Sequence, residues 1–482
     1  HLARQPVAPR ELRPEIPMVL SSIVMRLLAK NAEDRYQSSP GLLADLRRFA
    51  AAHKAGTVDD FELGEYDHSD RFSVSTALVG RESQLRSLSE AFERVCLGGN
   101  ETALIGGPAG IGKSALVHEL QRTLSARRGA FISGKFDALA HRSPYAALAT
   151  ALRELVLTLL GAPARVLKAW REAIAEAVGQ NGQLLVEMIP ELGVLLGPQP
   201  VVPTMPMAEA ADRFQSVLRR FITALACEDH PLVIFLDDLQ WADLATLHLI
   251  EDLGSDFELA YVLWIGTYRN DEVSPEHPMM RMRQALGDAQ AALTTQVLEP
   301  LDAPAVAQIV RASLHAWDRD DVVPLAASVH TRSHGNPFFI RALLTTLHEA
   351  NILRFDQDRG RWTWDLEAVA SASLPDDVVA LVTRRLQDLK DNCRGLLRVA
   401  AGIGGHFDIH LLSHVSGVTA AEAVADLARD GIRVVMASGD NPKAAAAIGA
   451  ELGITEVHGG LMPADKADLV RDLKAEGRIV AM

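Results

Sequence analysis

Apolar and polar positions follow two different periods in the middle of the chain. Between residues 77 and 301, short apolar runs bounded by polar residues predict strands, and the stretches between them have helical periodicity. The predicted strands are 102–105, 130–133, 232–236, 261–268 and 294–298. Because helical stretches separate the strands, the economical architecture is a parallel sheet covered by helices on both faces. The predicted fold class of this region is α/β.

The segments on either side have mainly helical patterns. Residues 1–52 carry two apolar stripes and predict two or three helices, whereas 53–76 is polar and acidic and predicts a linker. The other predicted segments are a helical lid at 302–352, a hairpin at 353–364 that turns at 358–360, and helices from 374 to about 425.

The composition is that of an ordinary globular protein and limits the possible partners. The 482 residues leave room for about three domains. A net charge of −14 gives no general attraction to nucleic acid or to an anionic membrane, although it leaves room for a local basic patch. Cys96, Cys227 and Cys393 lack the spacing of metal ligands, which favours a reducing, cytoplasmic compartment.

Neither a membrane span nor a secretion signal is predicted. No stretch reaches about 18 uninterrupted apolar residues, and the first residues lack a charged segment followed by an apolar one. The chain begins at His1, and Met482 directly follows an apolar, strand-like run, so we expect that both ends were cut from a longer chain.

A glycine-rich loop follows the first predicted strand. Residues 107–114 fit the phosphate-binding pattern G-x-x-x-x-G-K-[ST]. Gly107, Gly112, Lys113 and Ser114 occupy its fixed positions, and Gly110 is a small residue between them. Small residues let successive backbone N–H groups point at a β-phosphate, and a helix that begins near Lys113 adds its positive end. We expect Lys113 to bridge the β- and γ-phosphates and Ser114 to bind Mg²⁺. The alternative is a flexible glycine-rich turn.

Two carboxylates end the third predicted strand. Residues 232–236 are apolar and lead directly into Asp237 and Asp238. A buried strand would aim Asp237 at the Mg²⁺ shell through water and would place Asp238 to orient or deprotonate the attacking water. The alternative is a pair of acids that caps the next helix. The 124 residues between Lys113 and Asp237 leave room for an intervening strand.

From residue 61 to about residue 425, the chain resembles the STAND branch of AAA-like ATPases. Members of this branch are signal-transduction NTPases that often follow a protein kinase domain in bacterial regulators. Besides the phosphate loop, the resemblance is carried by residues 61–64, 78–82, 135–137, 144–145, 237–243, 266–269 and 335–339.

The resemblance implies further site residues and a mode of action. Val79, Gly80 and Arg81 would lie beside the adenine, Arg269 would be the sensor after the fourth strand, and Pro337 would close the lid on the base. Taken alone, Arg269 could be a surface arginine and Pro337 part of a plain turn. The family fold is a P-loop NTPase sheet with a helical lid and a winged helix, here partial. ATP with Mg²⁺, slow or conditional hydrolysis, and protein partners or self-association are implied as well.

The first residues resemble the end of the C-terminal lobe of a serine/threonine protein kinase. The likeness lies in residues 1–6, 28–37 and 45–46, and it implies a structural ion-pair role for Arg35. The chain has neither the glycine loop of such kinases nor their catalytic and Mg²⁺-binding aspartates. We therefore expect a kinase remnant without phosphotransfer activity.

The last segment changes character near residue 430. Its pattern is strand, helix, strand, helix, strand, and it resembles the phosphorylation domain of a heavy-metal (copper) P-type ATPase, a haloacid dehalogenase (HAD)-like fold. The resemblance implies that Ser438, Gly439, Asp440, Asn441 and Lys466 hold a phosphoryl group. The aspartyl nucleophile motif and the Gly-Asp-Gly metal loop are missing, so we expect no transport activity from this chain alone.

These patterns predict a series of domains and leave several interpretations open. The junction near 420–430 fits a chimera of two reading frames, a natural fusion, or an ordinary Rossmann-like half domain. The leading functional hypothesis is an ATP-binding signalling module, with a non-hydrolysing nucleotide-gated scaffold and a transporter fragment as alternatives. The predicted domains are a kinase remnant at 1–52, a linker at 53–76, the P-loop NTPase at 77–301, a helical lid with a partial winged helix at 302–427, and a truncated HAD-type half domain at 428–482.

Overall fold

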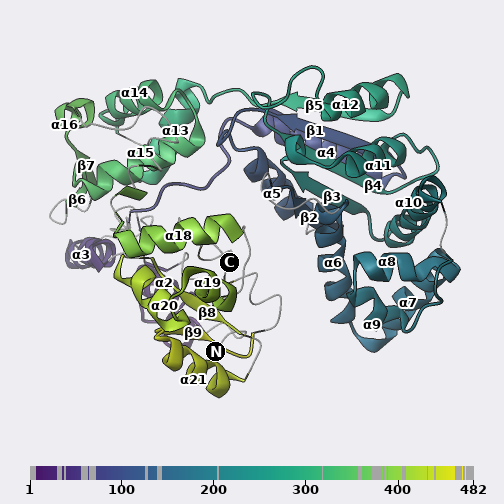
Figure 1. Ribbon diagram of the computed structural model, residues 1–482. Coiled ribbons are helices and arrows are strands. Elements are labelled where there is room, and N and C mark those ends of the chain that lie inside the picture. Colours follow the sequence, from purple (N-terminus) through teal and green to yellow (C-terminus); the bar gives the residue numbers. More distant parts are fainter. Residues whose placement is uncertain are drawn as a thin grey trace. The chain divides into compact units, whose positions relative to one another are not determined.

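The computed structural model divides into two compact units (Figure 1). One unit contains Leu78–Pro300 with Ala400–Gly405, and the other contains His1–Ala77, Leu301–Val399 and His406–Met482. The residues that the structure describes are 7–29, 35–36, 39–55, 63–64, 72–124, 129–137, 144–203, 206–316, 319–356, 361–371, 383, 386–387, 389–403, 409–430, 432–438, 441–461, 469 and 473.

The first unit is built on a parallel five-stranded sheet with the order β2-β3-β4-β1-β5. All five strands predicted between residues 77 and 301 are present, each within two residues of its predicted bounds. Their bounds are β1 Asn100–Gly106, β2 Ala130–Lys135, β3 Leu232–Asp237, β4 Val262–Tyr268 and β5 Ala292–Val297. The strand β2 is the predicted intervening strand between Lys113 and Asp237 in sequence, and β4 separates β1 from β3 in space.

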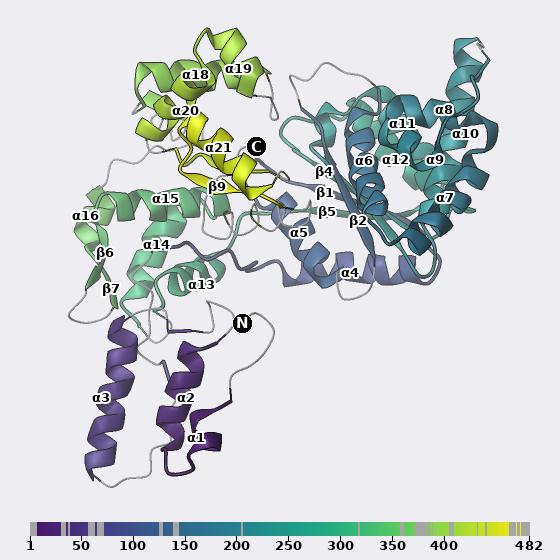
Figure 2. The same ribbon diagram turned by 90° about the horizontal axis from the view of Figure 1, so that it is seen from below.

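Helices cover both faces of this sheet, as predicted, because alternate residues of each central strand point to opposite sides. On one face, Val233, Phe235 and Ile265 pack with residues of α4 (Glu82–Cys96) and α5 (Lys113–Leu124). On the other, Ile234 and Trp264 pack with the remaining helices of the unit (Figure 2). The helices with buried residues in that second cluster include α6 Ala146–Leu160, α10 Met207–Leu225, α11 Leu244–Gly254 and α12 Pro278–Asp288.

The connection between β2 and β3 contains several helices. It begins with α6, ends with α10, and carries a compact helical group between them. That group consists of α7 Ala164–Val178, η2 Gly179–Asn181, α8 Gly182–Met188 and α9 Glu191–Leu196. Buried leucine and isoleucine side chains of α7, α8 and α9 belong to the same core cluster as α6 and α10, so the insertion extends the core of the sheet.

The second unit is mainly helical. Its described helices include α1 Pro9–Leu12, α2 Met18–Leu27, α3 Ser39–Ala55, α13 Ala303–Ser313, α14 Val322–Ser333, α15 Pro337–Glu349, α16 Leu366–Ser371, α19 Ile409–Ser416 and α20 Ala420–Arg429. Helix α18, Asp391–Ile403, is divided between the two units. The predicted hairpin is confirmed as β6 (Leu353–Asp356) and β7 (Arg361–Trp364), while its predicted turn at 358–360 lies outside the described residues.

The C-terminal segment contains the first part of its predicted pattern. Strands β8 (Val435–Ala437) and β9 (Glu456–His458) pair in parallel, and α21 (Pro442–Leu452) lies between them in sequence. Of the later predicted helix only residues 469 and 473 are described, and the last predicted strand lies outside the described residues, as do Gly439, Asp440 and Lys466. Within the described ranges, no helix is long and apolar enough to cross a membrane.

The end of β2 packs directly on the first turn of α6. A Cβ atom at Gly134 would lie 2.1 Å from the carbonyl oxygen of Ala147 and 2.7 Å from its carbonyl carbon. Backbone atoms held in a helix cannot move aside as a flexible side chain can. Glycine is therefore required for this close approach of strand and helix.

We predict that Gly134→Ala lowers the free energy of unfolding by about 1–3 kcal/mol, because the new methyl group overpacks this contact. Gly287→Ala is the matched control, since Gly287 is in α12 and a Cβ there meets nothing within 4 Å. That change should be neutral or stabilise by about 0.5 kcal/mol. Urea denaturation followed by tryptophan fluorescence measures both; equal midpoints for the two variants would contradict the prediction.

Candidate functional site

The loop between β1 and α5 has the backbone of a phosphate-binding loop. Gly107, Gly110 and Gly112 have φ angles of +150°, +75° and +100°, a region that L side chains rarely adopt. A Cβ at Gly112 would meet nothing within 4 Å, so the loop backbone is open on that side. Helix α5 begins at Lys113, as predicted. The sequence forms a tight turn whose N–H groups and helix end can receive an anion.

Lys113 is folded onto this loop. Its ammonium group donates hydrogen bonds to the carbonyl oxygens of Gly107 at 2.7 Å and Pro108 at 3.0 Å, and the residue is only 7% exposed. Burial lowers the pKa of Lys113, and the negative charges of Asp238 and Asp237 oppose that shift. A buried cation is thus held beside the loop.

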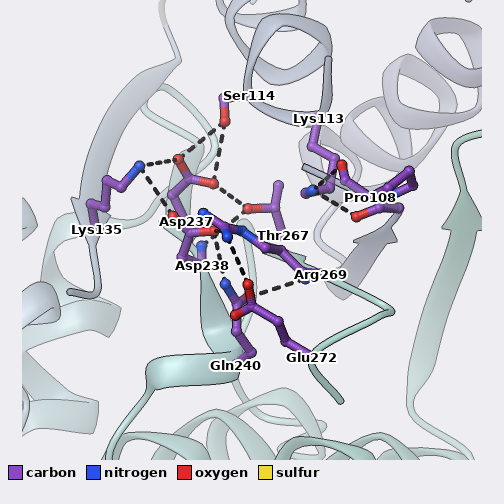
Figure 3. A network of polar contacts seen from close by, with 11 residues as sticks. Pro108, Lys113, Ser114, Lys135, Asp237, Asp238, Gln240, Thr267, Arg269 and Glu272 are labelled. Carbon is purple, nitrogen blue, oxygen red and sulfur yellow. Dashed lines mark hydrogen bonds and ion pairs between the residues drawn. The ribbon is translucent and has the colours of Figure 1, made fainter. Parts of the chain in front are cut away.

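The structure brings the predicted serine and aspartate together. The Ser114 hydroxyl lies 3.1 Å and 3.3 Å from the two carboxylate oxygens of Asp237, the last residue of β3. The Thr267 hydroxyl donates to Asp237 as well, and it accepts a 3.2 Å hydrogen bond from the backbone N–H of Asp238. Figure 3 shows this network at the carboxyl ends of the strands.

Asp238 is buried and held by several donors. It is 5% exposed and has a left-handed backbone, with φ 61° and ψ 49°. Its carboxylate accepts from Gln240 at 3.0 Å and lies 3.1 Å from the Lys135 ammonium and 3.6 Å from Nε of Arg269. Burial alone would raise the pKa of Asp238, but these donors and charges outweigh it and lower the pKa. Asp238 is therefore an ionised acceptor at neutral pH.

Arg269 follows β4 directly and is held from three sides. Its guanidinium lies 2.6 Å from Glu272 and 4.8 Å from the ring centre of Trp241, and its backbone N–H donates to Gln240 at 3.1 Å. Stacking on an aromatic ring restrains the planar cation. The arginine predicted as a sensor is thus fixed beside Asp238, and the ring of Trp241 supports it.

The predicted adenine-side residues lie in the same unit. Val79 is buried, Gly80 has a φ of +68°, and the guanidinium of Arg81 donates to the carbonyl of Glu299 at 2.5 Å. Burial lowers the pKa of Arg81, and the charge of Glu299 partly opposes it. The neighbouring Leu298 donates its N–H to the carbonyl of Gly106 at 2.9 Å, which links this segment to the start of the phosphate loop.

Pro337 belongs to the other unit, whose placement relative to this site is not part of the description. It begins α15 in the other unit, where Asn336 caps the helix by accepting from the N–H of Phe338 at 3.0 Å. The proposed contact of Pro337 with the base stays a prediction.

Several polar residues of the network received no role from the sequence. Thr267 is fully buried at the end of β4, Lys135 ends β2, and Gln240 and Glu272 lie just beyond β3 and β4. A polar residue at the carboxyl end of an apolar strand is the signal that could have found Thr267 and Lys135. Parallel strands bring these ends to one edge of the sheet.

The residues at this edge fit a magnesium ion. The Ser114 hydroxyl and the Asp237 carboxylate supply the hard oxygen atoms that Mg²⁺ prefers, and their approach to 3.1 Å shows that one ion could contact both. Across the described ranges, no group of three or more His, Cys, Asp or Glu residues could hold a metal.

Comparison with known families matches two regions of the chain. Residues 77–265 match the model described as an AAA ATPase domain. Residues 293–482 match the model described as a haloacid dehalogenase-like hydrolase. The second match begins well before residue 428, where the sequence predicted the HAD-type segment. The first region contains both the phosphate loop and the acidic pair.

Similar proteins come from signalling and transport. The hybrid signal transduction histidine kinase G of Dictyostelium discoideum is 27% identical over 501 residues, covering 86% of this chain and 14% of the kinase. A copper-exporting P-type ATPase of Mycobacterium leprae is 29% identical over 177 residues, covering 34% of this chain and 22% of the transporter. This chain therefore spans less than a quarter of either relative. A STAND protein with a tetratricopeptide repeat sensor from Pyrococcus horikoshii aligns with a TM-score of 0.36 and 12% identity, over 75% of this chain and 40% of that one.

We predict that Thr267→Val destabilises the protein by about 1–3 kcal/mol, because it removes the buried acceptor of the Asp238 N–H and a donor to Asp237. Thr102→Val is the matched control. Thr102 is also buried in a strand, and its hydroxyl has no hydrogen-bond partner within the part of the chain that the structure describes. The control should be neutral or stabilising. Thermal melting compares the two, and equal melting temperatures would refute the importance of the bridge.

Proposed function

We propose that residues 78–300 form an ATP-binding signalling module that hydrolyses ATP slowly or conditionally. The observation that carries the proposal is the approach of the Ser114 hydroxyl to Asp237 within 3.1 Å, beside a loop with three left-handed glycines. A phosphate loop alone could be a simple turn. Its meeting with a strand-end carboxylate supports a site for a triphosphate with its divalent ion. The match of residues 77–265 to AAA ATPase domains supports the same conclusion.

The residues of the site can divide the work of hydrolysis. Lys113 would leave the loop carbonyls and bind the phosphates, and Ser114 and Asp237 would hold Mg²⁺. Bound Mg²⁺ supplies charge neutralisation on the phosphate oxygens. Asp238 is ionised and can accept a hydrogen bond, or a proton, from a water molecule. Arg269, held 3.6 Å from Asp238, is a second cation that can meet the developing charge.

The module is proposed to act as a nucleotide-dependent switch within a kinase-linked regulator. The long alignment with a hybrid histidine kinase supports a place in such a regulator, since it covers 86% of this chain. The narrower link to serine/threonine kinases rests on residues 1–52 alone. The change would pass to protein partners or to another copy of the chain, and Val79, Gly80, Arg81 and Pro337 are the proposed contacts of the base.

A second candidate function concerns the C-terminal half. The match to haloacid dehalogenase-like hydrolases and the likeness to a copper-exporting P-type ATPase favour a fragment of a phosphorylation domain there. Binding of a phosphoryl group by that fragment would not depend on Lys113. The remaining alternative, a scaffold that binds ATP or ADP without turnover, shares the nucleotide site but releases no phosphate.

We predict that Lys113→Ala weakens ATP binding by at least about 100-fold, because the loop loses its phosphate-binding cation. Titration with a fluorescent ATP analogue in the presence of Mg²⁺ measures the affinity. Lys168→Ala is the control, since Lys168 is an exposed lysine on α7 that pairs only with Glu172 at 3.8 Å among the described residues. Unchanged affinity in the Lys113 variant would reject the site, and phosphate release that persists in it would mean that turnover does not use the phosphate loop.

We predict that Asp238→Asn keeps ATP affinity within about threefold but lowers the rate of phosphate release by about 100-fold or more. Asparagine fits the left-handed backbone and removes only the charge. Steady-state phosphate release gives the rate, and Glu258→Gln, an exposed carboxylate of the same unit, is the control. A wild-type rate in the Asp238 variant would remove Asp238 from the reaction. A wild-type protein that binds ATP without releasing phosphate would instead identify the scaffold.

A further inference from the structure

Lys135 is placed beside the acidic pair by the sheet itself. It ends β2, the edge strand, and its register partner on β3 is Asp237. Register partners on parallel strands point their side chains to the same face of the sheet. The backbone around Lys135 is restrained on both sides, since Phe136 donates its N–H to the carbonyl of Asp237 at 3.0 Å and Gly134 lies against α6.

The ammonium group of Lys135 faces one oxygen of each aspartate. It lies 3.6 Å from Oδ2 of Asp237 and 3.1 Å from Oδ2 of Asp238. The other oxygen of Asp238 is taken by Gln240 and Arg269. Asp238 is therefore held between two sets of donors on opposite sides, and Lys135 supplies one of them (Figure 3).

The exposure of Lys135 indicates that its ion pair with Asp238 does little to stabilise the fold. Its side chain is 65% exposed, whereas that of Asp238 is only 7% exposed. An ion pair with so exposed a partner contributes little to folding. The pair thus affects the position and charge balance of Asp238 more than the stability of the fold.

We propose that Lys135 is a positioning residue that orients the Asp238 carboxylate toward the attacking water. This inference rests on the proposed ATP hydrolysis at the same site. Lys135 acts through Asp238 and leaves nucleotide binding to the phosphate loop. Lys135 can reach both aspartates because it stands at the register position of Asp237.

The test compares Lys135→Ala, Lys135→Arg and the control Lys168→Ala in the full chain. We expect Lys135→Ala to lower kcat about 10- to 100-fold, as a small misplacement of a catalytic group can do. Its affinity for a fluorescent ATP analogue should stay within about twofold, and its melting temperature should equal that of Lys168→Ala. Lys135→Arg keeps a cation at similar reach and should restore most of kcat.

Three results would overturn the positioning role. These are an unchanged kcat in Lys135→Ala, an ATP affinity that falls as far as kcat and so indicates direct binding, and an arginine variant as slow as the alanine variant. The failure of the proposed function gives different results. A wild-type protein that binds no ATP, or binds it without phosphate release, overturns the ATPase itself, whereas normal turnover in Lys135→Ala overturns only the role of Lys135.

Discussion

The parallel register of β3 between β2 and β4 is the constraint on which the candidate site depends. Asp237 ends β3, with Lys135 as its partner on one side and the end of β4, which carries Thr267, on the other. The start of α5 brings Ser114 to the same edge. Residues that are more than 20 positions apart in sequence therefore meet because their strands point the same way and end at one level. A shift of the register would separate the charges that now hold each other.

The polar groups at this edge form a balanced set. Asp238 would be costly to bury alone as an anion, and Gln240 and Arg269 offset that cost, whereas the exposed Lys135 adds little to stability. Lys113 is likewise buried, and its ammonium is satisfied by two loop carbonyls. Each ionised group is thus already paired within the chain. If a phosphate anion and a divalent cation bind together, they can replace the partners that these groups have within the chain, so that no charge is left unpaired. Such an exchange is reversible, as a switch would require.

The sequence predicted the sheet and half of the site because their signals are local. Apolar runs mark the strands, the glycine pattern marks the loop, and Asp237 with Asp238 closes an apolar run. Lys135 and Thr267 are recognisable in the sequence as polar residues at strand ends, but their partners could not be assigned, because these depend on the strand order, in which β2 lies next to β3 and β4 separates β3 from β1. The sequence of a single segment does not determine the strand order. The roles assigned from resemblance, such as that of Pro337, stay predictions because that residue belongs to the other unit.

The left-handed backbone at Asp238 has a consequence for how such a protein could change over generations. Short polar side chains tolerate this conformation, whereas longer or branched ones strain it. Asparagine suits this backbone as aspartate does, and its codons lie one base change away from those of aspartate. The negative charge at this position could therefore be exchanged for a neutral amide while the surrounding backbone keeps its shape.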